Sequence, residues 1–337
     1  MDEQSRMRAA FARRRLVLAA GAAGMLSLTT PLVCLARGSG KMLRVGTLSM
    51  GVVSEPNNLL FAAAMRELGY VEGKNIVFER RFAQGDQSKL EQMARELVQL
   101  GVDVIYVSST APTTAAMKAT RSIPIVFVNV ADPVGSGFVA SLGHPGGNAT
   151  GISVQATELS AKRVQLLRDT FPGIRRLAVF VTDESAASLQ LSEVQRAAPQ
   201  LKLQVLPVKF MPGASEQAAM SVVRQWRADA LYFTETSQNF FNRQRLTQIA
   251  KQLRLPAVFG ANYYAEAGGL MSYGSSYEAN YRRAAIYVDK VLRGAHPSDL
   301  PVEQPTVFEL VLNLKTARAL HLEFPEATLL RADSTIE

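Results

Sequence analysis

Residues 123–154 read IPIVFVNVADPVGSGFVASLGHPGGNATGISV, and the predicted architecture follows from this segment. Its first part, Ile125–Val130, is an apolar run of the kind that forms a strand covered on both faces of a parallel sheet. The turn signal Asp132-Pro133 follows, and then a loop rich in turn-forming residues, Gly143–Asn148. A second short strand is predicted at Gly151–Val154. We interpret the stretch as the point where one α/β lobe is completed and the chain crosses to another.

Strands and helices alternate before this stretch. Strands are predicted at 43–48, 75–82 and 102–107, and Ser88-Lys89-Leu90-Glu91 has the pattern of a capping box that opens a helix. Alternation of this kind is typical of a doubly wound parallel sheet.

The same plan is repeated after the stretch, where Thr157 is expected to cap a helix. Four strands are predicted at 177–181, 203–208, 230–233 and 257–260, and a further strand, 270–273, would lead back to the first lobe. The two halves also contain similar short segments. Val102–Tyr106 resembles Ala228–Tyr232, and Ile123–Phe127 resembles Leu255–Phe259. Both observations favour two copies of one architecture.

We therefore predict an α/β fold with two doubly wound, Rossmann-like lobes that have parallel sheets. A helix over 277–293 should return to the first lobe, and a strand over 306–314 should follow a proline-punctuated linker. Three crossings between the lobes are expected, near Gly151, Gly274 and Glu303. The predicted boundaries are 43–153 plus 275–303 for the first lobe and 154–274 plus 304–337 for the second.

Composition fits two lobes and argues against nucleic-acid binding. The chain has 337 residues, 47% of them hydrophobic, which is ample for two cores. The formal net charge is +8, but residues 1–41 hold seven Lys/Arg and only two Asp/Glu. The remainder has 30 basic and 27 acidic residues, so no strongly basic surface is expected.

The first 36 residues are predicted to be a cleaved export signal, which would place the mature protein in the periplasm. A basic region, Arg6–Arg15, precedes a mildly apolar run, Leu16–Ala36, which is the order found in secretion signals. Arg13-Arg14-Arg15 also resembles a twin-arginine signal, so both export routes stay open, as does retention as a membrane anchor. The lone cysteine, Cys34, lies inside this segment, and its removal would exclude disulfides and cysteine nucleophiles.

Polar side chains follow several predicted strands, at the edge where an open parallel sheet presents groups to a ligand. We predict a ligand site between two such edges, built from Ser49, Ser108, Ser109, Thr110, Asn129, Asp132, Asp183, Thr234, Glu235 and Tyr263. Residues 108–110 precede a helix N-terminus, which suits a carboxylate. An acidic member would suit an ammonium group, and the tyrosine would pack against the ligand. The alternative for each residue is a structural role in a cap or turn.

The sequence offers little for catalysis. The three histidines, His144, His296 and His321, lie in turns or near helix ends, and neither an H-E-x-x-H nor a G-x-S-x-G motif occurs. The glycine-rich segment Gly143–Gly147 lacks the Lys-Ser/Thr of a phosphate loop. We expect neither a metal nor a cofactor, and no enzymatic activity.

A family resemblance is carried by Glu67–Ile76, Ile123–Val128 with Asp132–Gly135, Gly143–Gly151, Glu266–Gly274, Pro301–Pro305 and Phe308–Ala317. It covers essentially all of 43–337. These segments resemble the ABC-transporter substrate-binding protein family of the tryptophan/tyrosine-binding type. The resemblance implies a type I periplasmic binding protein that encloses a ligand between two lobes and delivers it to a membrane permease. Some relatives take aromatic amino acids. Ligand identity does not carry over, because the loops expected to line the cleft vary within the family.

These observations together predict a monomeric, extracytoplasmic solute receptor of an ABC importer. The expected ligand is an amino acid or a similar carboxylate, bound by hinge closure. One alternative is the effector domain of a regulator, which would need a DNA-binding segment where the export signal stands. Another is an α/β enzyme in which Asp132 or Glu235 acts on a substrate in the cleft.

Overall fold

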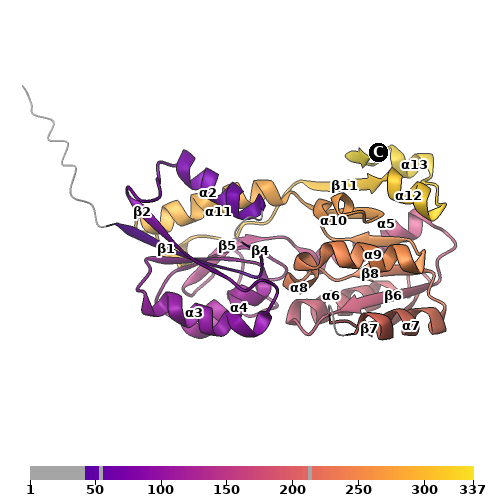
Figure 1. Cartoon of the computed structure of the whole chain (residues 1–337), viewed down its shortest axis with the longest axis horizontal. Helices are drawn as coiled ribbons and strands as arrows, with labels where there is room; N and C mark the ends of the chain where they lie inside the picture. Colours follow the sequence, from indigo (N-terminus) through magenta and orange to yellow (C-terminus); the bar gives the residue numbers. More distant parts are fainter. Residues whose placement is uncertain (1–41, 53–55, 212–214) are drawn as a thin grey trace, which may run out of the picture. The chain divides into compact units, whose positions relative to one another are not determined.

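The computed structural model describes residues 42–52, 56–211 and 215–337. The predicted export signal, Cys34 included, lies outside these residues. Among the helices in the described ranges, none has the length and apolar character that crossing a membrane requires. The described chain forms two sheets, each with helices on both faces (Figure 1).

The first sheet has five parallel strands in the order β2-β1-β3-β4-β5. They are β1 (Leu43–Ser49), β2 (Ile76–Phe82), β3 (Val104–Ser108), β4 (Ile125–Val130) and β5 (Ala149–Ser153). One face is covered by α2 (Pro56–Glu67) and α11 (Tyr277–Leu292), and the other by α3 (Leu90–Gln99) and α4 (Thr110–Ala119). All six residues of β4 are buried, as expected for a strand covered on both faces. We call this sheet with its helices lobe 1.

The second sheet has seven strands in the order β12-β11-β10-β9-β8-β6-β7. They are β6 (Arg176–Val181), β7 (Gln204–Lys209), β8 (Ala230–Phe233), β9 (Ala257–Phe259), β10 (Met271–Ser275), β11 (Phe308–Asn313) and β12 (Ser334–Ile336). One face packs on α5 (Ala156–Thr170), α6 (Ser185–Ala197) and α12 (Leu314–Leu320), and the other on α7 (Glu216–Trp226), α9 (Arg243–Leu253) and α10 (Asn262–Glu266). Two short helices complete it, α8 (Ser237–Phe241) and α13 (Glu326–Leu329). We call this sheet with its helices lobe 2.

The predicted two-lobed, doubly wound fold is confirmed, with one departure from parallel pairing. Strand β11 runs antiparallel to β10, with Met271 opposite Leu312. The reason lies in the chain path, because β10 leads out of lobe 2 towards α11 and β11 brings the chain back. The two strands therefore run in opposite directions along the same edge.

The chain passes between the lobes three times, after β5, after β10 and before β11. The first and third passages are paired, since Ser153 N donates to Glu303 O at 2.9 Å and Glu303 N donates to Gly151 O at 3.0 Å. In the second passage, a Cβ atom at Gly274 would lie 1.7 Å from the carbonyl oxygen of Gly260. Only glycine lets these two backbone segments approach so closely.

Two predicted helix caps are wrong. The helix expected from Ser88 begins at Leu90, and the side chain of Asp86 accepts the N–H of Ser88 at 3.1 Å at the start of the preceding 3-10 turn, Gln87–Lys89. The acidic side chain two residues earlier therefore takes the capping role. Thr157 lies inside α5, whose first residue is Ala156.

The single tryptophan of the chain, Trp226, is the last residue of α7. Its carbonyl oxygen accepts a hydrogen bond from Arg176 Nη1 at 3.3 Å, and Arg176 is the first residue of β6. Trp226 therefore lies at the edge of the second sheet where the parallel strands begin.

Candidate functional site

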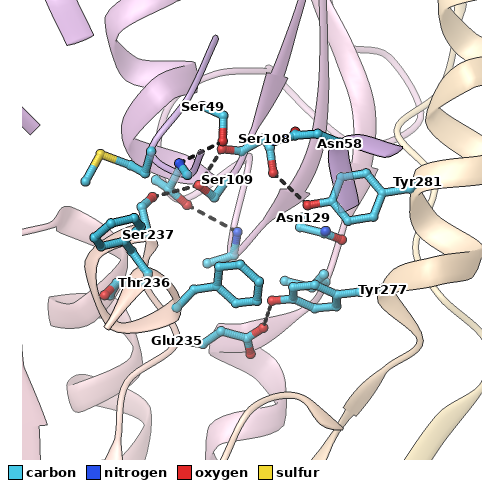
Figure 2. Close-up of a pocket in the computed structure, with 17 residues that line it drawn as sticks. Ser49, Asn58, Ser108, Ser109, Asn129, Glu235, Thr236, Ser237, Tyr277 and Tyr281 are labelled. Atoms are coloured by element: carbon cyan, nitrogen blue, oxygen red, sulfur yellow. Dashed lines mark hydrogen bonds between the residues drawn. The ribbon is translucent and has the colours of Figure 1, made fainter. Parts of the chain in front are cut away.

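A pocket lies where the carboxyl ends of lobe 1 strands meet the segment that follows β8 of lobe 2 (Figure 2). It is lined by Ser49, Met50, Gly51, Asn58, Ser108, Ser109, Thr110, Asn129, Ala131, Val154, Glu235, Thr236, Ser237, Phe240, Phe241, Tyr277 and Tyr281. The free space inside is about 30 Å³, whereas a cavity that holds benzene measures about 150 Å³. Binding of an aromatic or amino-acid-sized solute therefore requires these walls to move.

The wall from lobe 1 contains backbone strain at two neighbouring strand ends. Ser109, between β3 and α4, has φ 76° and ψ 174°, a conformation that is nearly restricted to glycine. Asn129, near the end of β4, has φ 56°. Strained backbone of this kind persists only where the surroundings enforce it, and it concentrates at binding and catalytic sites.

The side chain of Asn129 presents an unused donor to the pocket. Only 5% of the residue is exposed, and its Oδ1 accepts a hydrogen bond from Asn280 Nδ2 at 2.9 Å. Its own Nδ2 is buried and has no hydrogen-bond partner among the described residues. A buried donor without a partner costs roughly 1–3 kcal/mol. An acceptor atom on a bound ligand would recover this energy.

The wall from lobe 2 is held in place by a buried carboxylate beneath α8. Glu184 accepts the N–H of Ser237 at 3.2 Å and the N–H of Gln238 at 2.9 Å. The hydroxyl of Thr236 accepts the N–H of Asn239 at 3.2 Å. Burial raises the pKa of Glu184, although the N–H groups of Gln238 and Ser237 partly oppose that effect.

Glu235 is the acidic residue of the pocket, and both of its carboxylate oxygens are engaged. Oε2 accepts from Arg163 Nη2 at 2.8 Å. Oε1 accepts from the hydroxyl of Tyr277, as Figure 2 shows. Burial, reinforced by the neighbouring carboxylate, raises the pKa of Tyr277 well above its ordinary value. Arg163 is 1% exposed and donates to three carbonyl groups as well, those of Ala156 (3.1 Å), Tyr273 (2.7 Å) and Gly260 (3.2 Å).

Aromatic rings form the remaining side of the pocket. The Phe240 and Tyr277 rings stack with centroids 5.7 Å apart, and Tyr263 packs edge-on against both at 5.8 and 5.6 Å. The hydroxyl of Tyr281 lies 2.9 Å from Ser108 Oγ. This side is suited to a flat apolar group, while the serine and asparagine side chains opposite it are suited to a polar one.

Six of the ten predicted site residues line this pocket: Ser49, Ser108, Ser109, Thr110, Asn129 and Glu235. Tyr263 stands behind it, against Phe240 and Tyr277. The remaining three have other roles. Asp132 accepts the N–H of Gly135 at 2.7 Å in a turn, and the hydroxyl of Thr234 donates to the carbonyl group of Phe180 at 2.9 Å. Asp183 is exposed and borders a separate groove with Lys118.

The sequence reasoning missed five residues of the site and its support: Arg163, Ser237, Phe240, Tyr277 and Tyr281. Ser237 directly follows the predicted polar run after β8, so extending that run would have included it. The two tyrosines lie on α11, where a helical pattern predicts core packing and not ligand contact. Nothing in the sequence distinguishes Arg163 from a surface arginine, because its partners come from three distant segments.

Comparison with known proteins identifies the family. The family model described as "ABC transporter substrate binding protein" matches residues 60–336. The chain belongs to this family. A curated relative, the tyrosine-binding protein of Clostridioides difficile (strain R20291), is 29% identical over 266 residues, which is 78% of this chain and 76% of the relative.

Solved structures share the fold, which is that of type I periplasmic binding proteins. A Streptococcus pneumonia ABC domain in complex with L-Trp has a TM-score of 0.79 at 24% identity, covering 88% of this chain and 100% of the other. The ligand-free, open structure of a Clostridium difficile substrate-binding protein with adhesive properties has a TM-score of 0.61 at 23% identity, covering 88% and 98%. Family proteins of this class bind solutes and are usually extracytoplasmic.

Proposed function

We propose that this protein is an extracytoplasmic receptor that binds a small organic carboxylate in the interlobe pocket and delivers it to the permease of an ABC importer. The observation that carries the proposal is the composition of the pocket. The unpartnered Asn129 donor and the serine hydroxyls lie opposite the aromatic rings of Phe240 and Tyr277. Names of relatives support this reading, since one is a tyrosine-binding protein and another is solved with L-Trp.

Hinge closure is the proposed binding motion. The moving bodies are residues 43–153 with 275–303, and residues 154–274 with 304–337, joined by the three passages. The narrow pocket supports this, because a solute enters only if the lobes separate. The structure is also more similar to the L-Trp complex of one relative, with a TM-score of 0.79, than to the ligand-free, open structure of another, with a TM-score of 0.61.

We propose that the ligand leaves the receptor chemically unchanged. The one acidic side chain among the described pocket residues, Glu235, is held by Arg163 and Tyr277, which leaves it poorly placed for proton transfer. The proposed partners are therefore the small solute and the membrane permease, with no nucleic acid and with a monomeric receptor. Export by the signal in residues 1–36 would place the receptor in the periplasm.

Calorimetric titration of the purified protein with L-tyrosine, L-tryptophan, L-leucine and benzoate tests this function. Asn129→Ala should weaken the binding of whichever ligand binds by about tenfold, because one hydrogen bond from a buried donor is lost. Asp183→Asn, at the exposed groove, is the matched control and should leave the affinity unchanged. Absence of binding across the panel, or equal effects of the two substitutions, would contradict the proposal.

A further inference from the structure

The charge balance of the pocket indicates which carboxylates it accepts. Among the described residues that line the pocket, Glu235 is the one with a formal charge. Its carboxylate is 2.8 Å from the guanidinium of Arg163, which keeps its proton at any physiological pH. The pair is therefore neutral as a whole, and it offers a ligand ammonium no net negative charge.

The ion pair is built into the surrounding backbone. A Cβ atom at Gly260 would lie 2.1 Å from Glu235 Oε2, and one at Gly274 would lie 3.5 Å from Arg163 Nη2. Glycine at 260 leaves room for the carboxylate, whereas a Cβ atom at 274 would make only ordinary van der Waals contact with the guanidinium. Tyr277 closes the remaining side by donating its hydroxyl to Oε1. Glu235 consequently has a fixed partner for each oxygen before any ligand is considered.

The opposite wall favours an anion or a neutral acceptor. Asn129 Nδ2 is buried and unpartnered. The hydroxyls of Ser108 and Ser109, at the N-terminus of the ten-residue helix α4, line the same pocket and are hydrogen-bonded to Tyr281 and Ser237. Helix N-termini stabilise carboxylates through their N–H groups and dipole. The described pocket thus provides a free donor, Asn129 Nδ2, for a carboxylate and rings for an arene, and both oxygens of its acidic group are already hydrogen-bonded.

We propose that the pocket selects aromatic monocarboxylates that lack an α-ammonium group, and that Arg163 is the specificity-determining residue because it keeps Glu235 occupied. This inference rests on the proposed function and narrows its ligand class. An α-ammonium group would have to lose its water next to a neutral ion pair. This desolvation costs free energy, and no negatively charged group in the described pocket is free to compensate for it.

Matched ligand pairs provide the first test. L-Tyrosine and L-tryptophan are each titrated calorimetrically against their desamino analogues, the corresponding arylpropanoates, which differ only by loss of the ammonium group. We expect the desamino acid to bind at least about tenfold tighter, equivalent to about 1.4 kcal/mol. Equal or tighter binding of the amino acid would overturn the inference while leaving the proposed function intact. No binding by any member of either pair would instead refute the proposed function itself.

Substitutions of Glu235 and Tyr277, which form a network with Arg163, give a second test. The competing explanation is that Glu235 binds the ligand ammonium, and it predicts a different change in affinity. Glu235→Gln leaves a positive charge beneath the pocket, so binding of the desamino acid should tighten at least threefold. If Glu235 instead receives a ligand ammonium, the wild type binds the amino acid at least as tightly as the desamino acid, and the same change removes that preference. That second pattern would overturn the inference.

Tyr277→Phe is the complementary variant. It keeps the ring stack on Phe240, so it should fold even if Glu235→Gln does not. It frees Oε1, so the preference for the desamino acid should fall at least threefold. An unchanged preference would count against the role of the network. Glu326→Gln, at the exposed start of α13, is the control and should leave the ligand preference unchanged. An equal change of preference in Tyr277→Phe and in this control would overturn the inference.

Discussion

The hydroxyl oxygens of Ser109 and Ser237 lie 2.8 Å apart and join lobe 1 to lobe 2 at the pocket (Figure 2). Ser237 Oγ also accepts the N–H of Ala111 at 3.2 Å, so the side chain from lobe 2 rests on the N-terminus of α4. The two lobes are therefore connected at the place where the proposed ligand carboxylate binds, and closure of the lobes and binding of the ligand depend on the same atoms.

Ser237→Ala should weaken ligand binding by about threefold to tenfold. It removes the two hydrogen bonds that the Ser237 side chain makes with lobe 1, each of which contributes about 0.5–1.5 kcal/mol. Thr236 and Glu184 still cap α8 in this variant. Calorimetry with the best ligand of the panel measures the change. Ser192→Ala, on the exposed face of α6, is the control. An affinity for the Ser237 variant equal to that of the control would show that the contact contributes nothing to closure.

Arg163→Met should lower the free energy of unfolding by about 3–5 kcal/mol, because it leaves the carboxylate of Glu235 buried and unpaired. Urea denaturation measures this. Arg282→Gln breaks exposed ion pairs with Glu67 and Glu278 and should cost less than about 1 kcal/mol. The double variant Arg163→Met/Glu235→Gln should recover part of the loss, since it removes the lone charge. No recovery would mean that packing of the arginine, and not its charge, is what matters.

The buried Glu184 should make the folded protein more stable at acidic pH than at neutral pH, relative to Glu184→Gln. Burial raises the pKa of this carboxyl in the folded state, so between its unfolded and folded pKa values the folded protein binds more protons. Its contribution to stability is therefore greatest below the unfolded pKa and declines as pH rises through the folded pKa. The difference in unfolding free energy between wild type and variant, measured across pH, should follow this direction.

Glu303 provides a control of opposite sign for that experiment. The hydrogen bonds from Arg283 lower the pKa of Glu303, so its stabilising contribution is present above the unfolded pKa and is lost as pH falls through the folded pKa. The Glu303→Gln comparison should therefore slope the other way. Parallel slopes for the two variants would contradict the assignment of burial as the cause at Glu184.

Gly274→Ala should destabilise the protein by more than about 2 kcal/mol, because its Cβ atom would overlap the carbonyl oxygen of Gly260. Gly147→Ala meets no atom within 4 Å and should change stability by about 0.5 kcal/mol or less. Thermal unfolding of the two variants side by side measures the contrast. Similar unfolding temperatures would mean that the second passage between the lobes relaxes to admit a methyl group.

Much of the fold was predictable because parallel strands covered on both faces leave continuous apolar runs. The segments that became β4 and β8 carry such runs, and the polar residues after them fall at the edges where the lobes meet. The antiparallel direction of β11 was not predictable from its own residues. It follows from the route of the chain between lobes, which a local pattern does not encode.

The site was predictable only in part, because residues with the same sequence context have different roles. Asp132 and Glu235 both follow a buried strand, yet the first closes a turn and the second enters the pocket. The local sequence does not separate these outcomes. Arg163 and Tyr277 reach Glu235 from helices on either side of the passages between the lobes, so their role depends on tertiary packing.

The position of Trp226 determines how ligand binding should be followed in solution. The single indole of the chain lies where the strands of the second sheet begin, whereas the pocket lies beyond their other ends. Its intrinsic fluorescence should therefore stay constant when a ligand without an indole binds, and a silent emission spectrum would say nothing about occupancy. An optical sensor built on this receptor needs its fluorophore on α8, where Phe240→Trp would place an indole against Tyr277.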